Sequence, residues 1–263
     1  MLLLYCLHFH FPGGQYLIAG GFVDGAAYNM TEVFDLVKTS SSPSFGQLPS
    51  PRTEAVGTIL GNAPLICGGS EGGGSFPLYT CISYYQDSQW TQSNYMDDAR
   101  QHAAGVNVNS TKFWILGGYQ LSGNSLDSTE FIIQGQTNGV PGPKLPYALR
   151  GMCAIKFTNN EIFVIGGRDS DGGYRNEVWI YDPQNGFART QGPSLTTARG
   201  FHSCSTMEDS KKTLIVVAGG YDGYQLDSVE IYNPTDNTWH SGKNKFLISK
   251  IFLLIDCSKK ENR

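Results

Sequence analysis

The chain has 263 residues, a formal net charge of −4, 16% charged residues and six cysteines. Because the charge is mildly acidic and the lysines and arginines are scattered, no surface for nucleic acid or anionic membrane is expected. The length suits one large domain. The cysteines show no CxxC or CxxH spacing, which argues against a structural zinc site.

The first eleven residues, MLLLYCLHFHF, form an apolar run. A signal peptide would have a basic residue before such a run and a small-residue cleavage site after it, and both are missing here. We therefore favour a first β-strand over a signal peptide.

An apolar run that ends in Gly-Gly then occurs five times, as QYLIAGG, APLICGG, KFWILGG, EIFVIGG and TLIVVAGG. The intervals between successive pairs are 48, 49, 49 and 53 residues, and the first glycines are Gly20, Gly68, Gly117, Gly166 and Gly219. A period near fifty predicts one supersecondary unit per copy, with neighbouring units sharing a core. Because the runs do not alternate, both faces of these strands are predicted to be buried.

An arginine keeps step with the glycines, preceding the next pair by 16, 17, 16 and 20 positions at Arg52, Arg100, Arg150 and Arg199. Recurrence in register predicts a structural role for these four, tying one unit to the next. Each arginine is followed by a strand, a polar hairpin, the Gly-Gly strand, an acid- or aromatic-rich strand, a further hairpin and a last strand that carries Trp in the best-matching copies. Each unit is therefore predicted to contain four short antiparallel strands.

This pattern resembles the kelch repeat, a four-stranded β-propeller blade marked by Gly-Gly and by spaced Tyr and Trp. AGGYDGYQLDSVEIYNPTDNTW follows the family pattern most fully, and the resemblance covers roughly residues 15–242. It implies an all-β kelch-type propeller with five recognisable blades, approximately 3–51, 52–99, 100–149, 150–198 and 199–242. Since most kelch rings have more than five blades, we expect an incomplete ring, six-bladed when whole, with an exposed edge.

The last residues, 243–263, fit no kelch position. Their apolar run, 246–256, is shorter than the roughly 20 residues that a membrane-spanning helix needs. Gly242-Lys243 is also what a read-through splice donor would encode. We interpret 243–263 as a non-kelch tail, with a gene-model artefact as one explanation, and expect no membrane span.

Four cysteines lie at repeat positions. Cys67 ends one strand and Cys81 begins the next, across a hairpin, while Cys153 and Cys204 fall on inner strands of adjacent units. Two interpretations stay open: buried thiols in a reducing compartment, or the disulfides Cys67–Cys81 and Cys153–Cys204 in a secreted protein.

The compartment follows from the same choice. The CGG…C pattern resembles that of kelch-like proteins thought to be secreted in some invertebrates, which favours an extracellular over a cytoplasmic location. Sequons at Asn29 and Asn109 permit glycosylation. They decide nothing, because a chain this rich in Asn, Ser and Thr acquires sequons by chance.

The loops that precede the arginines and those that follow the Gly-Gly pairs are predicted to share one face of the ring. Tyrosine and arginine on such loops over a rigid scaffold are typical of interaction hot spots. Arg168 and Arg175 occur in one unit only, so they are the better candidates for contacting a carboxylate. Kelch domains that capture acidic peptides use this face, so the resemblance implies the same place. The candidate residues of this face are Tyr28, Phe76, Tyr119, Arg168, Tyr174, Arg175, Tyr221 and Tyr224.

We therefore expect a non-enzymatic scaffold that binds a protein or peptide, with a glycan left open as a partner. One alternative is a metal-dependent oxidase-like or carbohydrate-acting enzyme of the same fold, and another is a filament-crosslinking protein. An oxidase would hold its metal with His and Tyr on converging loops, whereas the histidines and repeat cysteines here fall in strands or at edges. No nucleophile–base pair and no Gly-rich phosphate loop occurs, so no catalytic residue, metal or cofactor is predicted.

Overall fold

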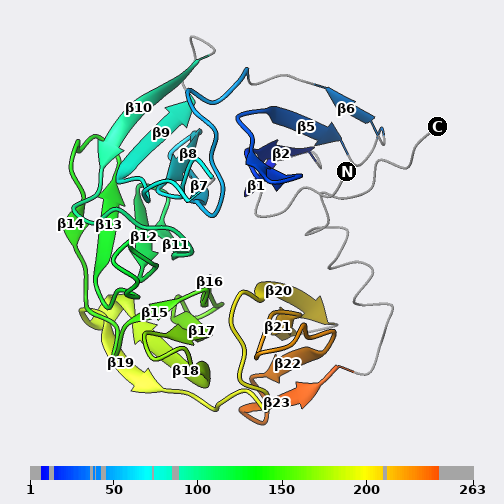
Figure 1. Cartoon of the computed structure of the whole chain (residues 1–263). Coiled ribbons are helices and arrows are strands. Elements are labelled where there is room, and N and C mark those ends of the chain that lie inside the picture. Colours follow the sequence, from blue (N-terminus) through cyan, green and yellow to red (C-terminus); the bar gives the residue numbers. More distant parts are fainter. Residues whose placement is uncertain are drawn as a thin grey trace.

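The computed structural model describes residues 7–11, 15–35, 38, 40–42, 46–72, 74–84, 89–209 and 212–242. These residues form five larger antiparallel sheets arranged in an arc around a central axis, and one two-stranded hairpin (Figure 1). Each of the five larger sheets is called a blade and is numbered along the chain. Apart from the short 3-10 turn η1 (Pro183–Asn185), the described elements are β-strands.

The first two blades have their strands side by side in sequence order. Blade one consists of β1 (Leu7–Phe11), β2 (Gln15–Ala19), β5 (Thr31–Asp35) and β6 (Ser40–Ser42), with a small hairpin of β3 (Phe22–Val23) and β4 (Ala26–Ala27) beside it. Blade two consists of β7 (Val56–Leu60), β8 (Ala63–Cys67), β9 (Thr80–Tyr84) and β10 (Trp90–Tyr95).

The other three blades repeat this order. Blade three consists of β11 (Ala104–Asn109), β12 (Lys112–Leu116), β13 (Thr129–Ile133) and β14 (Val140–Pro141). Blade four has a divided inner strand, β15 (Leu149–Arg150) and β16 (Cys153–Lys156), followed by β17 (Ile162–Asp169), β18 (Tyr174–Asp182) and β19 (Ala188–Gln191). Blade five consists of β20 (Ser203–Asp209), β21 (Lys212–Ala218), β22 (Val229–Asn233) and β23 (Thr238–Ser241).

The Gly-Gly strand is the second strand of each blade and is buried on both faces. In β8, Ile66 packs toward blade one in a cluster with Leu17, whereas Leu65 and Cys67 pack toward blade three in a cluster with Ile115. Successive residues thus enter two different cores, which explains why the apolar runs do not alternate. The all-β propeller architecture predicted from the repeat is confirmed.

The glycine pair is required where one blade meets the start of the next. Gly166 has φ +58°, and a Cβ added there would lie 2.6 Å from the carbonyl oxygen of Arg199 in blade five. The next amide, Gly167 N, donates a hydrogen bond of 2.9 Å to that same oxygen. Only glycine permits both the left-handed backbone and this close approach. The same contact recurs between Gly20 and Arg52, Gly68 and Arg100, and Gly117 and Leu149.

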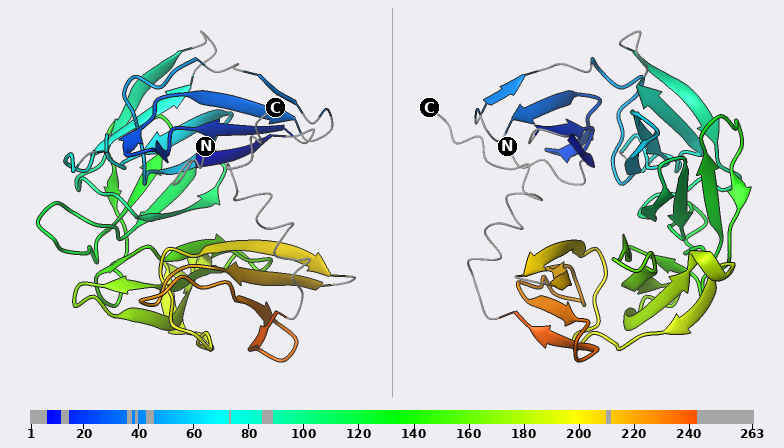
Figure 2. Two further views of the ribbon diagram at one scale, coloured as in Figure 1. Left: turned by 45° about the vertical axis from the view of Figure 1, so that its right-hand side comes forward. Right: turned by 180° about the vertical axis from the view of Figure 1, so that it is seen from behind.

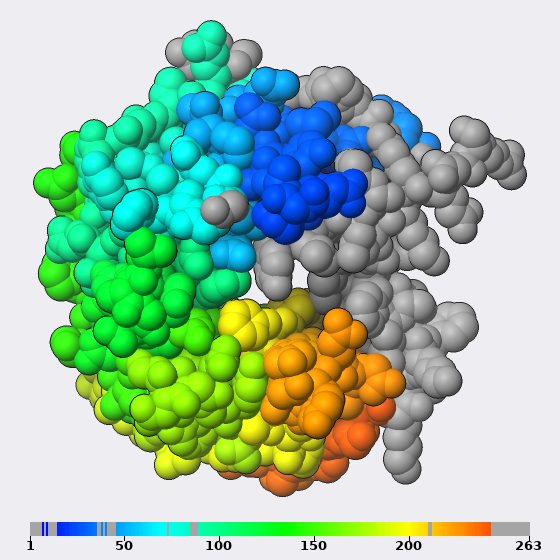
Figure 3. All heavy atoms as spheres, in the orientation of Figure 1, coloured from blue at the N-terminus to red at the C-terminus, as the bar shows by residue number. Residues whose placement is uncertain are grey.

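Two further views show the blades lying one after another around the axis, with blades one and five on either side of the opening of the arc (Figure 2). The inner strands β1, β7, β11, β16 and β20 contact one another in that order. The molecular surface is hollowed at the centre of the arc (Figure 3). The predictions for residues 1–6 and for the tail 243–263 lie outside the described residues.

Candidate functional site

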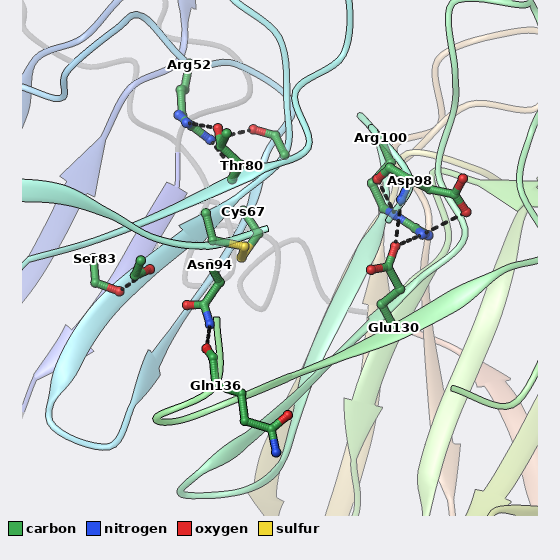
Figure 4. Close-up of a disulfide and its surroundings, with 12 residues drawn as sticks. Arg52, Cys67, Thr80, Ser83, Asn94, Asp98, Arg100, Glu130 and Gln136 are labelled. Atoms are coloured by element: carbon green, nitrogen blue, oxygen red, sulfur yellow. Dashed lines mark hydrogen bonds and ion pairs between the residues drawn. A yellow bond between two sulfur atoms is a disulfide. The ribbon is translucent and has the colours of Figure 1, made fainter. Parts of the chain in front are cut away.

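Three of the repeat arginines, Arg52, Arg100 and Arg199, are buried anchors within their own blades. Arg100 Nη1 donates to the carbonyl oxygens of Gly117 (2.7 Å) and Ser128 (3.0 Å), and its Nη2 lies 2.5 Å from Glu130 Oε1 (Figure 4). Its side chain has no exposed surface, and that of Glu130 has 3%. This fully buried guanidinium joins the end of β12 to the start of β13, and its charge is balanced by its carboxylate partner.

Blade five repeats the arrangement with Arg199. Its Nη1 donates to Gly219 O at 2.8 Å and to Ser228 O at 3.2 Å, and its Nη2 lies 2.9 Å from Glu230 Oε1. In blade two, Arg52 makes the same carbonyl contacts, to Gly68 and Thr80, but has no carboxylate partner at this place. Burial lowers the pKa of Arg52 to about 10, against the opposing effect of Glu71.

The structure corrects the prediction that Arg150 is the fourth anchor. The carbonyl that receives the amide of the next glycine belongs to Leu149, as shown by the 2.8 Å bond from Gly118 N. Leu149 is also four residues before β16, as Arg100 is before β11, and it is 1% exposed. Arg150 is therefore one position further on and lies half-buried on the face of the ring.

Arg150 lies directly opposite Arg168 in the pairing of β15 with β17. Directly opposed residues of two strands share one face of the sheet, so the two guanidinium groups are neighbours. The pKa of Arg150 is lowered by burial and by the positive charge of Arg168. Among the described residues neither group has an ion-pair partner; Arg150 donates to Ser125 Oγ at 3.3 Å and Arg168 to Gly172 O at 3.2 Å. The pair is a concentration of positive charge suited to an anion.

Tyrosines flank this pair on both sides. The guanidinium carbon of Arg150 lies 4.5 Å from the ring centre of Tyr119, and that of Arg168 lies 5.4 Å from Tyr174. Tyr174 in turn meets Tyr221 edge to face at 5.7 Å. We call these residues the arginine–tyrosine row; it crosses blades three, four and five and consists of Tyr119, Arg150, Arg168, Tyr174 and Tyr221.

Arg175, a predicted carboxylate contact, is already engaged within its own blade. Its Nη2 lies 2.5 Å from Asp169 Oδ2, and its Nη1 lies 3.8 Å from Glu177 Oε1. Burial would lower its pKa, but the hydrogen bond and charge of Asp169 together with Glu177 raise it overall. Arg168 and Arg175 thus differ: the first has no ion-pair partner among the described residues and the second has two.

The ring contacts that join the row do not include the other predicted face residues. Tyr224 is 83% exposed in the loop between β21 and β22, and Phe76 is 73% exposed in the loop between β8 and β9. Tyr28 is half-buried, and its backbone bonds to Gly21 and Arg52 at the junction of blades one and two. The sequence interpretation missed an exposed aromatic pair, Tyr79 and Tyr95, whose rings stack at 5.9 Å.

A chain of backbone hydrogen bonds runs around the axis near the row. The amide of His102 donates to Glu54 O, that of Gly151 to His102 O, and that of Phe201 to Gly151 O. All four residues have φ between 54° and 61° and stand two places after the anchor position. At Glu54, His102 and Phe201 the residue type did not indicate a positive φ, because residues other than glycine rarely adopt it.

A cavity of about 210 Å³ lies at this place, lined by Glu54, Ala55, His102, Ala103, Gly151, Met152, Phe201 and His202. His102 Nε2 lies 3.2 Å from Glu54 Oε2. Burial, with the charge of Arg150, lowers the pKa of His102 to about 4; burial, with Arg199, lowers that of His202 to about 3. Burial raises the pKa of Glu54. Both imidazoles are therefore neutral at pH 7.

The two cysteine pairings considered for the sequence are both present as disulfides. Cys67 and Cys81 are directly opposed in β8 and β9 and have no exposed surface (Figure 4). Cys153 and Cys204 join the inner strands of blades four and five and are half-buried. Of the sequon residues, Asn109 is exposed at the β11–β12 turn, whereas the side-chain amide of Asn29 donates to Leu48 O.

The described part of the chain contains no group of three or more His, Cys, Asp or Glu residues placed to hold a metal ion. Nor does any helix within it have the length and apolarity to cross a membrane.

Comparison with known proteins identifies the repeat. The model of the Kelch motif family matches residues 149–186 and 210–245. The chain contains kelch motifs in a β-propeller fold. It is 30% identical over 130 residues to Kelch-like protein 40 of Mus musculus, covering 49% of this chain and 20% of that protein. It is 26% identical to Beta-scruin of Limulus polyphemus, covering 66% of this chain and 21% of that protein.

The chain therefore spans about a fifth of the length of these curated relatives. Among solved structures, that of YjhT matches with a TM-score of 0.76 at 13% identity, covering 92% of this chain and 84% of that one. At this identity the likeness concerns the fold alone.

Proposed function

We propose that this kelch propeller is a non-enzymatic scaffold that binds an acidic segment of a protein partner on the arginine–tyrosine row. The kelch motif and the two curated relatives support an interaction scaffold in general. The observation that carries the finer assignment is the opposition of Arg150 and Arg168 in the β15–β17 ladder without a carboxylate partner among the described residues.

Like charges at directly opposed ladder positions destabilise a sheet. A carboxylate placed between the two guanidinium groups removes that repulsion and gains charge-assisted hydrogen bonds. Binding of an acid is therefore favoured more here than at a single exposed arginine. Asp169, whose charge raises the pKa of Arg150, forms its ion pair with Arg175.

The tyrosines add apolar contact area to the charge that the two arginines supply. Tyr119 and Tyr174 hold the guanidinium planes by cation–π contact, which limits their motion before a partner arrives. Tyr221 is 40% exposed and extends the row onto blade five. Arginine and tyrosine side chains held on a rigid scaffold are the residue types that dominate measured interfaces.

The test selects ligands without assuming a partner. A phage-displayed library of random peptides is panned on the full chain, on Arg150→Glu with Arg168→Glu, and on Arg189→Glu. Arg189 is the matched control, because it is an exposed arginine of the same blade on the outer strand β19.

We expect the native chain and the control to select peptides rich in Asp and Glu, and the doubly reversed variant to lose them. Selection of the same acidic peptides by the reversed variant would place the site elsewhere. Enrichment of peptides without acidic residues by the native chain would reject the proposed ligand class.

A further inference from the structure

The two sequons of the chain lie in different structural settings. They are Asn29-Met30-Thr31, at the start of β5, and Asn109-Ser110-Thr111, at the β11–β12 turn. A glycan is attached through the side chain of the asparagine, and the sequon also requires a hydroxyl two positions later. The surroundings of the side-chain amide and of the hydroxyl therefore distinguish the two sequons.

The amide of the first sequon has a structural role that recurs in the repeat. Asn29 Nδ2 donates to Leu48 O at 3.3 Å, as Asn176 Nδ2 donates to Leu195 O at 3.0 Å in blade four. The backbones of the same two pairs are also bonded, from Leu48 N to Asn29 O and from Leu195 N to Asn176 O. A glycan on Asn29 would therefore compete with a contact that the blade uses.

The hydroxyl of the first sequon is engaged in the same way. Thr31 and Thr129 each begin the strand that follows the Gly-Gly loop of their blade, and both are buried. Thr31 Oγ1 donates to Gly46 O, and Thr129 Oγ1 donates to Pro143 O at 2.9 Å. The fold thus accounts for both the asparagine and the threonine of this sequon.

The second sequon is exposed at all three positions, Asn109, Ser110 and Thr111. Asn109 Oδ1 accepts hydrogen bonds from Thr111 N at 2.9 Å and from Thr111 Oγ1 at 3.1 Å. Its Nδ2 makes no hydrogen bond within the described part of the chain. The turn itself is held in place, because Gly61 N donates to Ser110 O and Gln134 N to Thr111 O. The fold therefore presents the Asn109 amide nitrogen on a fixed, accessible turn.

The disulfides are an independent observation that bears on glycosylation. Cys67 is bonded to Cys81 within blade two, and Cys153 is bonded to Cys204 between blades four and five. Disulfides form and persist in the secretory pathway and outside the cell, and they are rare in the cytosol. N-linked glycans belong to the surface loops of secreted proteins. The disulfides therefore favour a compartment in which an exposed sequon is used.

We propose that Asn109 carries an N-linked glycan and that Asn29 does not. The donor is an oligosaccharide joined to a lipid through a diphosphate. Asn109 Nδ2 forms a bond to the anomeric carbon of the first sugar and gives up one proton, while the lipid diphosphate leaves that carbon with the electron pair of the broken bond. The product is an amide-linked glycan on the β11–β12 turn.

The glycan lies on the face of the ring opposite the arginine–tyrosine row. Strand β11 begins at Ala104, close to the anchor position, and ends at Asn109, which separates these residues by about 17 Å. Tyr119 of the row follows β12 at the other end of the same hairpin. The glycan therefore covers the face of the short hairpins and leaves the row open. This inference does not depend on what the row binds.

The first experiment tests which sequon is used. The full chain is expressed in cultured animal cells behind a supplied cleavable leader. The disulfide-bonded product is treated with peptide-N-glycosidase F and mapped by mass spectrometry. We expect one glycan, at Asn109, which Thr111→Ala removes and Thr111→Ser retains. The control Asn29→Asp, which copies Asp127 at the equivalent place in blade three, should leave the glycan unchanged. A glycan on Asn29, or none on Asn109, would overturn the proposal.

The second experiment tests the compartment on the protein as its own cells make it. The protein is isolated from its tissue in the presence of an alkylating reagent. We expect the glycosidase to convert Asn109 to aspartate, and Cys153 and Cys204 to resist alkylation until a reductant is added. An unmodified Asn109 in this protein would overturn the proposal, whether or not the row binds acidic peptides.

Discussion

Blades three and five hold their strands together with a buried arginine, whereas blade four has Leu149 at the equivalent place. In blades three and five the guanidinium satisfies the first glycine carbonyl and a buried glutamate. In blade four the position equivalent to Glu130 and Glu230 is Trp179, which pairs with Val164 as Glu130 pairs with Ile115 and Glu230 with Val217. Loss of the arginine anchor thus goes together with loss of its buried acid.

The comparison shows how one repeat position can change its role. Arg150 is next to Leu149 and pairs with Arg168 in the β15–β17 ladder, so both side chains lie on the same face of the sheet. Arg150 is therefore not buried inside the blade as Arg100 is. Blade four also has a bond that the other described junctions do not have, the disulfide from Cys153 to Cys204 in blade five. A blade with fewer buried polar contacts is therefore fastened covalently and carries the cationic face.

The largest expected effect is on the anchor of blade three. Arg100→Leu copies the residue of blade four but leaves Glu130 buried without a cation. Breaking such a pair costs about 3–5 kcal/mol of the free energy of unfolding. Chemical denaturation measures the loss.

The double variant, Arg100→Leu with Glu130→Leu, should recover part of it, because no fully buried charge is then left unpaired. Asp98, whose carboxylate lies 3.4 Å from Arg100 Nη2, is 34% exposed and stays solvated. A loss below about 1 kcal/mol for the single variant would show that the buried pair is not an anchor, since exposed ion pairs contribute that little.

The disulfide between blades four and five should have the next largest effect. Cys153→Ala with Cys204→Ala is expected to destabilise the fold by about 2–4 kcal/mol, since the bond closes a long loop of chain. The pair Cys67 and Cys81 closes a shorter segment of 14 residues, against 51, and should contribute less. Thermal unfolding of both double variants compares them, and an equal or larger loss for the hairpin pair would argue against the role of the inter-blade bond.

The free energy of unfolding should also decrease when the pH is lowered, because His202 is protonated more readily in the unfolded chain. Its pKa is lowered to about 3 in the folded state from 6.5, so the unfolded chain binds more protons between these values. The contribution is fully present above about pH 6.5 and is lost as pH falls toward 3. Between pH 7 and 5 the loss is about 2 kcal/mol.

Because Glu54 and His102 also titrate near the axis, the effect is read as a difference between proteins. His202→Gln should show a shallower fall in melting temperature over pH 7–5 than the native chain. Parallel curves for the two proteins would mean that His202 does not titrate as its burial requires.

The smallest stability effect is expected at Arg150. Because it is half-buried, has no ion-pair partner among the described residues and faces a like charge, Arg150→Leu should change the free energy of unfolding by no more than about 0.5 kcal/mol. If Arg150→Leu lowered the free energy of unfolding as much as Arg100→Leu does, Arg150 would have the structural role that its spacing in the sequence predicts.

The repeat and the blade architecture could be read from the sequence because both depend on local patterns. Gly-Gly pairs, apolar runs and turn residues each act within a few positions, and the non-alternating runs signalled burial on both faces. The pairing of Cys67 with Cys81 was visible from hairpin symmetry. Counting back from the inner strands, as in LRGMC against RQHAA, would have placed Leu149 at the anchor position.

The site depends on contacts that no local pattern encodes. The opposition of Arg150 and Arg168 follows from a ladder register across 18 residues. The engagement of Arg175 by Asp169 depends on how the β17–β18 loop folds. The positive φ of Glu54, His102 and Phe201 is imposed by blade-to-blade hydrogen bonds and overrides the preferences of those residues.

The central claim is that displacement of Arg150 from the anchor position creates, with Arg168, the acid-binding site. The most direct measurement is calorimetric titration of an acidic peptide selected on the native chain against Arg150→Leu, Arg168→Leu and the double variant, with melting temperatures recorded in parallel. We predict that each single variant weakens the peptide at least about tenfold, or about 1.4 kcal/mol, that the double variant does not bind it, and that all three melt as the native chain does. Affinity within about twofold of native for the double variant would contradict the account.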